Sequence, residues 1–383
     1  MTATITHVEI LMVDLVPTTK RTDAIQSFVS QETPIVRVHD SDGAVGTGYC
    51  YTIGTGGYSV IELLRRTLVP ALIGRDPDRI EAIWRDLLRL THATSVGTIT
   101  SLALAAIDIA LWDLRSRKTG IPLHKLAGGA QERIPVYTTE GGWLHIPIEA
   151  IIEDTFAVRE RGFKGAKVKI GRPIAEDVAR LAALREAVGD DFEIFTDANQ
   201  SFRLDDALRR VAAYAPFGLG WIEEPLAADD LHSHVLLAQH SNIPIAVGES
   251  LYSLRQFNSY CHANACSIVQ VDVARVGGIT PWLKVAHMAE AFNMSVCPHF
   301  LMEIHAPLCA AVPNAKWVEY IPQLEPITTV GLRVEDGHAI PSEAPGLGIE
   351  WDWDAIEHMT IEGTAWIMGS DHSPRASAGS VRA

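Results

Sequence analysis

Three carboxylates recur at an equal spacing along this chain. Asp197, Glu223 and Glu249 follow one another at intervals of 26 residues, and each closes a short apolar run typical of a β-strand. A repeating unit of strand, loop and helix has about this length in a parallel barrel, so we expect the three acids at the same end of neighbouring strands. Oxygen ligands that converge in this way are the kind that Mg²⁺ binds. The spacing therefore predicts a magnesium site formed by these three residues.

Two lysines lie on the strand-like run that precedes this series. Lys167 and Lys169 alternate in GAKVKIG, and a period of two points both side chains to one face, here the barrel interior. Close together and near a divalent cation, two ammonium groups lower each other's pKa, so that one can serve as a neutral base near pH 7. We expect Lys167 to pair with a substrate carboxylate and Lys169, placed deeper, to act as the base. Taken alone, the pair would also fit two solvated lysines before a glycine.

An acid and a histidine end the sixth and seventh strand-like runs. Asp272 can accept a hydrogen bond from one ring nitrogen of His299 and fix its tautomer, which leaves the other nitrogen to move protons. Glu319 lies in the eighth run and, if protonated, could hydrogen-bond a substrate carboxylate. We expect Lys169 and His299 on opposite sides of the rim, where they can address both faces of one carbon atom. In isolation, an aspartate or a histidine would more often be a packing or surface residue.

Residues outside this series are candidates for binding the rest of a substrate. Asn199 follows the first of the three carboxylates by two positions and should also point inward. Two loops of the N-terminal region, PTTKRTDAIQSF and YTIGTGGYS, are expected to meet the far end of the substrate, and they offer Lys20, Arg21, Tyr51 and Tyr58. The polar groups of the first loop suit hydroxyls or a second carboxylate better than an aromatic ring, because unpaired polar groups are costly to bury. An ordinary solvated loop is the alternative interpretation.

The elements that must position these residues form an α/β pattern. Strand-like runs alternate with alanine-rich helical segments through residues 131–322, which predicts a (β/α)₈-type, TIM-like barrel whose closing helices are incomplete. Residues 1–130 combine two strands, a hairpin and three helical patterns, and we expect an α+β capping domain there. Residues 323–383 should return to the cap and complete it, with a poorly ordered tail from residue 370.

Composition excludes several classes of function. The formal net charge of −15 argues against a nucleic-acid partner, since proteins that bind nucleic acids usually carry basic surfaces. The N-terminus lacks the pattern of a signal peptide, and no apolar run reaches the length of a membrane span, so we expect no membrane partner. Five cysteines without paired CxxC spacing suit reduced thiols. These features predict a cytoplasmic protein.

The complete series of site residues resembles a known family. It is similar to the mandelate racemase subgroup of the enolase superfamily, and the likeness extends to the N-terminal cap, the helix IDIALWDL and the closing segment GLGIEWDWD. The resemblance implies one Mg²⁺ per subunit and abstraction of a proton next to a carboxylate by a lysine or histidine base, to give an enediolate. Muconate-lactonising relatives carry a lysine on the sixth strand, where this chain has Asp272, which argues against them. The motifs that carry the resemblance are Lys167-x-Lys169, Asp197-x-Asn199, WIEEP with Glu223, Glu249, Asp272, His299 and Glu319.

The fate of the enediolate stays open at this point. The segment CPHFLMEIHAPLCAAVP resembles acid-sugar dehydratases, whereas GTGYCYTIGTGGYS is closer to cycloisomerases of anhydro-sugar acids. With two bases, racemisation or epimerisation of a 2-hydroxy acid is a further outcome, and a metal-binding barrel without catalysis is the alternative of a different class. We favour dehydration of a sugar acid, a small-molecule carboxylate. We also expect a homo-oligomer.

Overall fold

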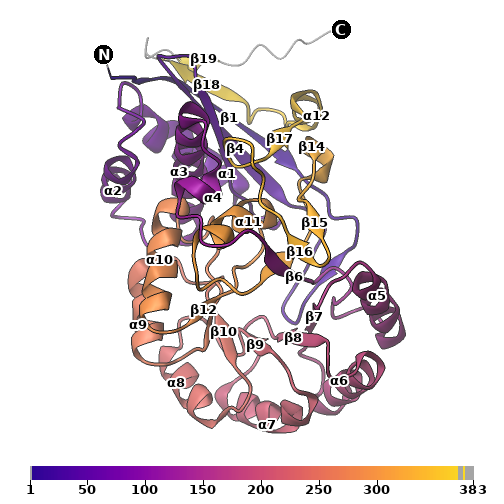
Figure 1. Cartoon of the computed structure of the whole chain (residues 1–383). Helices are drawn as coiled ribbons and strands as arrows, with labels where there is room; N and C mark the ends of the chain where they lie inside the picture. The colour runs from indigo at the N-terminus through magenta and orange to yellow at the C-terminus, as the bar shows by residue number, and fades with distance from the viewer. Residues whose placement is uncertain (1, 370–373, 376–383) are drawn as a thin grey trace.

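A parallel barrel forms the lower part of the molecule in the computed structural model, which describes residues 2–369 and 374–375 (Figure 1). Its strands pair in sequence order, and the ring closes where β13 pairs in parallel with β6. A bridge between Val296 and Ala315 joins the seventh strand to the segment before the eighth. The predicted barrel is thus confirmed. The strands are β6 (Ile134–Thr138), β7 (Gly165–Lys169), β8 (Glu193–Asp197), β9 (Trp221–Glu223), β10 (Ile245–Val247), β11 (Ile268–Val269), β12 (Ser295–Val296) and β13 (Val318–Tyr320).

Helices cover the outside of the barrel after each of the first seven strands. No covering helix follows β13 among the described residues, because the chain passes there into the C-terminal segment. That side is instead covered by α4 (Leu123–Leu126), which packs on the last barrel helix, and by β16 (His338–Ala339), which pairs with β6. The barrel helices are α5 (Ile148–Glu160), α6 (Ile174–Val188), α7 (Leu204–Tyr214), α8 (Leu231–His240), α9 (Leu254–His262), α10 (Ile279–Ala291) and α11 (Met302–Ala311).

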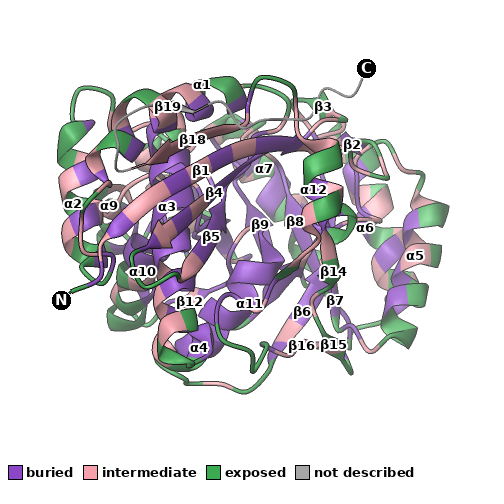
Figure 2. Ribbon diagram, turned by 90° about the horizontal axis from the view of Figure 1, so that it is seen from above, coloured by how far each residue is buried: buried purple, intermediate pink, exposed green. Residues whose placement is uncertain are grey.

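Large side chains fill the barrel beneath its carboxyl end. Phe195 and Trp221 stack with ring centroids 3.7 Å apart, and both are buried. Each lies two residues before an acid, Asp197 or Glu223, so the period of two places an aromatic layer directly below the acids. Cys297, two residues before His299, belongs to the same buried cluster. Figure 2 shows these central strands as buried.

The cap is a sheet with one long helix packed on it. Its strand order is β19 (Pro374–Arg375), β18 (Trp366–Gly369), β1, β4 and β5, and α3 (Thr98–Thr119) lies directly on β5. Gly46 and Gly48 allow this approach, because an added Cβ would lie 2.1 and 2.3 Å from backbone oxygens of α3. The helical segment over residues 57–71 is divided into three short helices, and Pro70, which lacks the N–H that continues an α-helix, lies in the last of them. The remaining elements are β1 (Ile5–Asp14), β4 (Glu32–Asp40), β5 (Val45–Tyr49), α1 (Gly57–Leu63), η1 (Leu64–Leu68), η2 (Val69–Ala71) and α2 (Ile80–Leu90).

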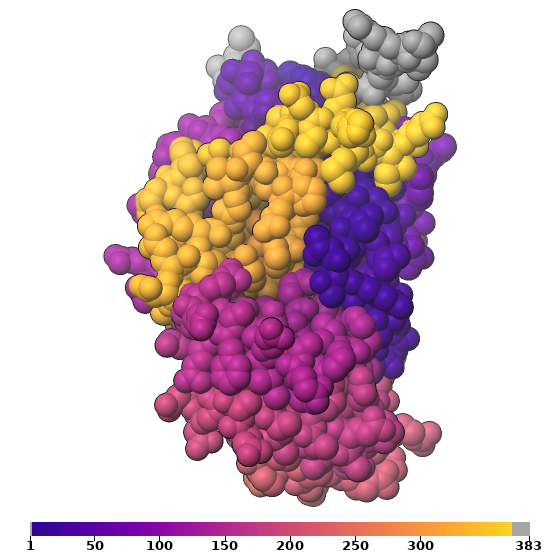
Figure 3. Space-filling view, turned by 90° about the vertical axis from the view of Figure 1, so that its right-hand side faces the viewer, coloured from indigo at the N-terminus to yellow at the C-terminus, as the bar shows by residue number. Residues whose placement is uncertain are grey.

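The C-terminal segment returns to the cap, as expected. β18 (Trp366–Gly369) pairs antiparallel with β1, and Figure 3 shows this segment in yellow beside the indigo N-terminal residues, above the barrel. The tail expected to be poorly ordered, residues 370–383, lies outside the described residues except for β19 (Pro374–Arg375). Along the described chain, no helix is both long and apolar enough to cross a membrane. The other elements are η4 (Glu325–Ile327), β14 (Thr328–Val330), β15 (Val334–Glu335), β17 (Glu350–Trp351) and α12 (Trp353–Met359).

A small hairpin of the cap lies over the mouth of the barrel. β2 (Arg21–Thr22) and β3 (Ser27–Phe28) pair antiparallel, and the carboxylate of Asp23 accepts the N–H groups of Ile25 and Gln26, both at 2.8 Å. The Leu144 N–H, in the loop after β6, donates to the carbonyl of Thr22 at 2.9 Å. This segment therefore closes over the site as a structured turn.

Candidate active site

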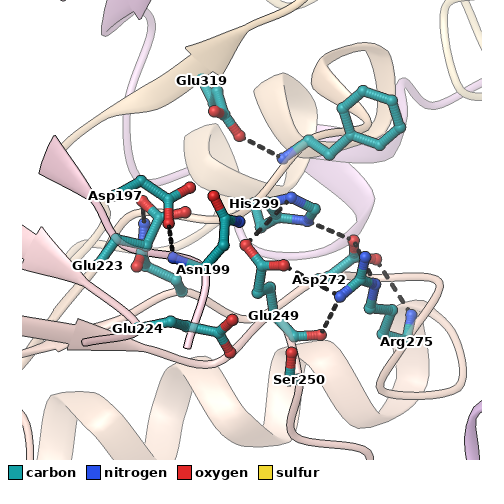
Figure 4. A network of polar contacts seen from close by, with 12 residues as sticks. Asp197, Asn199, Glu223, Glu224, Glu249, Ser250, Asp272, Arg275, His299 and Glu319 are labelled. Carbon is teal, nitrogen blue, oxygen red and sulfur yellow. Dashed lines mark hydrogen bonds and ion pairs between the residues drawn. The ribbon is translucent and has the colours of Figure 1, made fainter. Parts of the chain in front are cut away.

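The three carboxylates spaced by 26 residues converge at the barrel mouth. Asp197 and Glu223 are the last residues of β8 and β9 and lie opposite each other in the strand register, while Glu249 follows β10 (Figure 4). One carboxylate oxygen from each lies within 4.8 Å of the others, and all three residues are buried. Burial and the charges of the neighbouring carboxylates raise the pKa of Glu223 to about 8. The Lys167 ammonium lowers this pKa but only partly offsets their effect. Three repelling carboxylates at this distance call for a cation.

Their chemistry fits a divalent metal ion. Mg²⁺ is bound in proteins by carboxylate oxygens, and here three such oxygens come from the ends of neighbouring strands. Glu249 Oε2 is buried and makes no hydrogen bond with the described residues, although His299 Nε2 lies 3.3 Å away. An orphaned acceptor aimed at two other carboxylates is the feature that a bound cation would satisfy.

Both lysines of β7 point into the same site, but their details differ from the expectation. Lys167 Nζ lies 2.8 Å from Glu223 Oε1 and 2.7 Å from Glu319 Oε1, and Lys169 pairs with Asp197. The side chain of Lys167 is 1% exposed and that of Lys169 is 6% exposed, so Lys167 is the deeper one. The reason is that Lys169 is the last residue of β7 and lies nearer the mouth.

Neither lysine has the lowered pKa that the sequence suggested. Burial alone would lower both values, but the carboxylates around Lys167 and the Asp197 carboxylate beside Lys169 outweigh it and raise the pKa of each. The repulsion between the two ammonium groups is the weaker effect, because each has an acid as its immediate partner.

Asp272 and His299 form a hydrogen-bonded pair. His299 Nδ1 lies 2.8 Å from Asp272 Oδ2, and the other carboxylate oxygen accepts the N–H groups of Ala274 and Arg275 at 2.8 and 3.1 Å. Burial opposes ionisation of Asp272, yet the His299 ring lowers its pKa to about 2. Burial also lowers the pKa of His299, but Glu249 and Asp272 raise it further than burial lowers it. The pair leaves Nε2 facing the carboxylate cluster (Figure 4).

Glu319 anchors the loop that carries His299. It accepts hydrogen bonds from Thr139 Oγ1 at 2.6 Å and from the Phe300 N–H at 2.8 Å. Burial opposes its ionisation, but the Lys167 ammonium holds the pKa of Glu319 below its usual range. The protonated form, which the hydrogen bond to a substrate carboxylate considered from the sequence would require, is therefore not the favoured one in this geometry, because a lysine is the neighbour of Glu319.

His305 holds the other side of the same loop. It is fully buried, and its Nδ1 lies 2.8 Å from the Phe300 carbonyl oxygen while its Nε2 accepts the Val273 N–H at 3.1 Å. Phe300 and Leu301 have positive φ angles of 59° and 28°, which side chains rarely adopt. Contacts on both sides of this peptide maintain the conformation that aims His299.

Tyr51 contacts the acid–base pair as well as the cavity. Its hydroxyl donates to Asp272 Oδ2 at 2.7 Å and accepts from Arg275 Nε at 3.0 Å. Arg275 also donates to the carbonyl oxygen and to Oε1 of Glu249, both at 3.1 Å. Burial raises the pKa of the Tyr51 hydroxyl, so it stays a donor. A cap residue thus links the histidine pair to a candidate metal ligand.

Several residues of the site had no role in the sequence argument. Gln270 Nε2 donates to Glu223 Oε2 at 2.7 Å, and Trp221 Nε1 donates to the same oxygen at 3.2 Å. Both lie two residues before a site acid, so the strand period could have found them. Thr139 and Arg275 lie in loops beyond strand ends, where no periodic pattern points to them.

The cavity above the carboxylates contains three of the five predicted substrate contacts. Arg21, Tyr51 and Asn199 line it, together with the lysines, His299 and Glu319, and its volume is about 60 Å³. Lys20 is exposed and is not among the lining residues. Tyr58 is 56% exposed on the solvent face of α1 and also lies outside the cavity.

Other hollows lie beside this cavity or apart from it. One of about 260 Å³ adjoins it and shares residues such as Gln26, Tyr51 and Asn199. The largest, about 870 Å³, lies between α4 and the C-terminal segment and shares none of its lining residues with the carboxylate site. The chemistry therefore lies at the smaller cavity, where the ionisable groups converge.

Two family models match this sequence. The mandelate racemase / muconate lactonizing enzyme N-terminal domain matches residues 7–128, and the enolase C-terminal domain-like family matches residues 151–355. The chain belongs to the mandelate racemase and muconate lactonizing enzyme family of the enolase superfamily.

Its relatives within that family include enzymes that act on sugar acids. The L-talarate/galactarate dehydratase of Salmonella typhimurium is 38% identical over 315 residues, which cover 82% of this chain and 79% of that protein. The 3,6-anhydro-alpha-L-galactonate cycloisomerase of Streptomyces coelicolor is 35% identical over 347 residues, covering 90% and 96%. A crystal structure of the Salmonella dehydratase, liganded with Mg and L-lyxarohydroxamate, superposes with a TM-score of 0.92 at 34% identity, covering 96% of this chain and 95% of that one.

Proposed function

We propose that this protein is a Mg²⁺-dependent acid-sugar dehydratase. It removes the proton next to the carboxylate of a sugar acid to give an enediolate and then eliminates water from the neighbouring carbon. The observation that carries this proposal is the placement of Lys169 and the Asp272–His299 pair around one cluster of three carboxylates. The similarity to sugar-acid dehydratases supports it.

Asp197, Glu223 and Glu249 are the proposed ligands of one Mg²⁺. The fit of their buried oxygens supports this assignment, as do related structures that contain Mg. When bound, the ion supplies positive charge that stabilises the negative charge developing on the substrate carboxylate, and it neutralises acids that otherwise hold protons on the lysines.

Lys169 and His299 divide the proton transfers in this proposal. Lys169, in its neutral amine form, takes the proton from the carbon next to the carboxylate, since its Nζ reaches the cluster at Asp197. His299 reaches the cluster from the Glu249 side and donates a proton to the departing hydroxyl, so that water leaves. Asp272 keeps the histidine ring oriented.

Lys167 and Glu319 position the substrate carboxylate. The lysine ammonium lies between Glu223 and Glu319, where it can offset the charge of an incoming anion. Glu319 holds the Phe300 N–H and thereby the loop of His299. Their burial at the floor of the cavity supports a role in binding the reacting end.

The cap residues favour a polyhydroxylated acid over an aryl acid. Arg21, Asp23 and Gln26 line the cavity opposite the cluster, and Arg21 is buried with Glu140 as its ion-pair partner at 2.7 Å. An aromatic ring would cover these polar side chains without offering them hydrogen bonds, and a buried polar group that loses a partner costs roughly 1–3 kcal/mol. Asn199 Oδ1 is also buried without a partner and lines the same cavity, which supports contact with a substrate hydroxyl.

Cycloisomerisation of an anhydro-sugar acid is the second candidate. The cycloisomerase relative covers more of this chain than the dehydratase relative does. The same groups would serve, because expelling a ring oxygen needs the same acid as expelling a hydroxyl. The two reactions differ in their products, since dehydration loses one water and cycloisomerisation gives an isomer.

The test is a screen of acid sugars in D₂O with Mg²⁺, followed by proton NMR and mass spectrometry. We expect loss of water from at least one aldarate or aldonate, with one deuteron incorporated in the product. His299→Asn should abolish net turnover while exchange of the α-proton continues, and Lys169→Ala should abolish both. His287→Asn, an exposed histidine on α10, is the matched control.

Three outcomes would overturn parts of this assignment. Wild-type turnover in His299→Asn or Lys169→Ala removes that residue from the mechanism. A mandelate-type acid that exceeds every acid sugar in kcat/KM rejects the dehydratase in favour of a racemase. An isomeric product from an anhydro-sugar acid, with no water lost from any acid, selects the cycloisomerase.

We also propose a cytoplasmic location and a homo-oligomeric assembly. All five cysteines are buried free thiols, which suits a reducing compartment. Val16, Ile25 and Val29 are more than half exposed on the loops of the cap, and an assembly that covers them is consistent with that exposure. Light scattering of the purified protein tests the assembly.

A further inference from the structure

A second group of possible metal ligands lies on the cap sheet. His7 and Glu9 project from β1, and His39 projects from the neighbouring β4, on strands that take no part in the barrel (Figures 1 and 2). In the strand register His7 is directly opposite His39, so the backbone pairing itself brings the two rings together. Their ring centroids are 3.9 Å apart.

The ligand atoms are close to the spacing that a small metal ion requires. Glu9 Oε1 lies 3.0 Å from His39 Nε2 and 4.0 Å from His7 Nε2. In a tetrahedral zinc site with bonds of about 2.0–2.2 Å, neighbouring ligand atoms are separated by about 3.3 Å. The observed distances lie on either side of this value. The two rings are stacked with an interplanar angle of 19°, so metal binding requires His7, the more exposed ring, to rotate its Nε2 toward the ion.

Thr6 fixes which nitrogen of His7 is available. The register shifts between Ile5 and His7, so Thr6 is an extra residue at a β-bulge. Its hydroxyl donates to the His39 carbonyl oxygen at 3.3 Å and lies 3.2 Å from His7 Nδ1. With the single hydroxyl proton directed to that carbonyl oxygen, we assign His7 Nδ1 as the donor to the hydroxyl, which leaves Nε2 of the neutral ring unprotonated on the side of Glu9. Partners of this kind orient histidine ligands in metal sites.

Arg37 holds the carboxylate without occupying the ligand position. Its guanidinium binds Glu9 Oε2 at 2.7 Å and stacks on the Trp353 ring at 4.1 Å. The other oxygen, Oε1, is the one that faces both histidines. His39 Nε2 is buried and makes no hydrogen bond of good geometry, although it lies next to that oxygen.

We infer that His7, Glu9 and His39 form a second metal site, which binds a divalent transition ion of the zinc type. Zn²⁺ binds two imidazoles and one carboxylate in a tetrahedral site, with a water as the fourth ligand. Mg²⁺ prefers oxygen ligands, so the two histidines do not suit it. The site would join β1 to β4, the two strands between which the chain forms the hairpin over the barrel mouth. It is therefore a clamp on the cap sheet, independent of the proposed reaction.

Calorimetric titration of the full-length protein with Zn²⁺ tests the inference. The titration is made in excess Mg²⁺, and again in the Asp197→Asn chain, so that zinc binding by the barrel carboxylates can be recognised. We expect one binding event that persists in both proteins and raises the melting temperature. His39→Gln and His7→Gln should each weaken it at least 10-fold, whereas His287→Gln, which alters an exposed histidine on α10, should leave it unchanged.

Glu9→Gln provides an independent check, because it keeps the shape of the side chain and both histidines. It should also weaken zinc binding, and circular dichroism identifies any variant that fails to fold. Zinc binding that is the same in all three site variants as in the wild-type protein would overturn the inference. So would a zinc event that disappears in Asp197→Asn alone, since it would then belong to the barrel. Turnover is not a readout, so failure of the proposed function leaves this test intact.

Discussion

At the scale of single residues, the site combines acids that repel one another with cations that hold them in place. Asp197, Glu223 and Glu249 lie within 4.8 Å, and Lys167, Lys169 and Arg275 each contact one or more of them. The positive charges are arranged around the cluster, and Glu249 Oε2 is the oxygen of these three carboxylates that makes no hydrogen bond with the described residues.

Asp197→Asn should therefore lose most activity. The change removes one negative charge and one oxygen ligand while keeping the size of the side chain, so Mg²⁺ should bind more weakly and kcat should fall at least about 100-fold. Activity assays over a series of Mg²⁺ concentrations measure both effects. Asp205→Asn, at an exposed acid of α7, is the control. Full activity of the wild-type protein after chelation would contradict the metal requirement.

Tyr51, which the sequence suggested only as a substrate contact, also contacts the acid–base pair. Its hydroxyl donates to Asp272, so Tyr51→Phe should leave the Asp272–His299 pair less firmly oriented. We expect kcat for elimination to fall about 10-fold, the equivalent of one hydrogen bond to a charged group, with little change in KM. Exchange of the α-proton by Lys169 should continue at its former rate.

Tyr58→Phe is the control, because Tyr58 is an exposed tyrosine in the same segment. It should match the wild-type protein in both exchange and elimination. Equal losses of exchange and elimination in Tyr51→Phe would show that the tyrosine supports the fold of the site rather than the histidine pair.

At the scale of elements, the ends of the barrel strands hold backbone conformations that regular structure does not use. Asn199, Gln200 and Glu224 have φ angles of 44°, 62° and 36°, and Phe300 and Leu301 are also positive. All five follow strands that carry site residues. Such conformations persist where surrounding contacts enforce them, and here they turn the chain while the preceding side chains point inward.

His305 predicts how acid affects one of these turns. Burial lowers the pKa of His305 to about 4, below the 6.5 of an exposed histidine. The unfolded chain therefore binds the extra proton first, so this residue's contribution is complete above pH 6.5 and is lost as the pH falls toward 4. The free energy of unfolding should drop by about 2–3 kcal/mol from this group over that range.

Urea unfolding at pH 7, 5.5 and 4.5 measures this effect. His305→Gln should be less stable at pH 7, because two hydrogen bonds to the turn are altered, but its stability should fall less steeply with acid. His287→Gln, an exposed histidine, should follow the wild-type slope. Parallel pH dependence of His305→Gln and the wild-type protein would rule out this account.

At the scale of the whole molecule, the site is complete only where the cap meets the barrel. Arg21 of the cap pairs with Glu140 of the loop after β6, and Gln31 donates to Gln323 at 2.8 Å at the same junction. The cavity between the two parts is small, about 60 Å³, compared with about 300–1,000 Å³ for typical ligand pockets. We therefore expect the hairpin to move so that a substrate can enter, and to return to cover it.

Glu140→Gln tests this junction. The change leaves the buried guanidinium of Arg21 without its charged partner, so the closed position of the hairpin should be less populated. We expect KM to rise about 10-fold with a smaller change in kcat, because the acid–base groups belong to the barrel. Glu149→Gln, at an exposed acid of α5, is the control, and an unchanged KM would contradict the role of this ion pair.

The acids at the strand ends could be found from the sequence alone because two local regularities fix them. The period of two along a strand and the nearly constant length of a strand–helix repeat together place Asp197, Glu223 and Glu249 at one rim. The same rules account for the acid–base pair of Asp272 and His299, and for the aromatic layer of Phe195 and Trp221 beneath the acids.

Only the tertiary structure decided the contacts made between distant parts of the chain. Tyr51 meets Asp272 across 221 residues, Lys20 and Tyr58 are exposed outside the cavity, and Lys167 lies deeper than Lys169. Even the direction of the lysine pKa shifts depends on which carboxylates lie nearest. Periodicity fixes the face of a strand on which a side chain lies, whereas distances, exposure and charge balance depend on how the cap packs against the barrel.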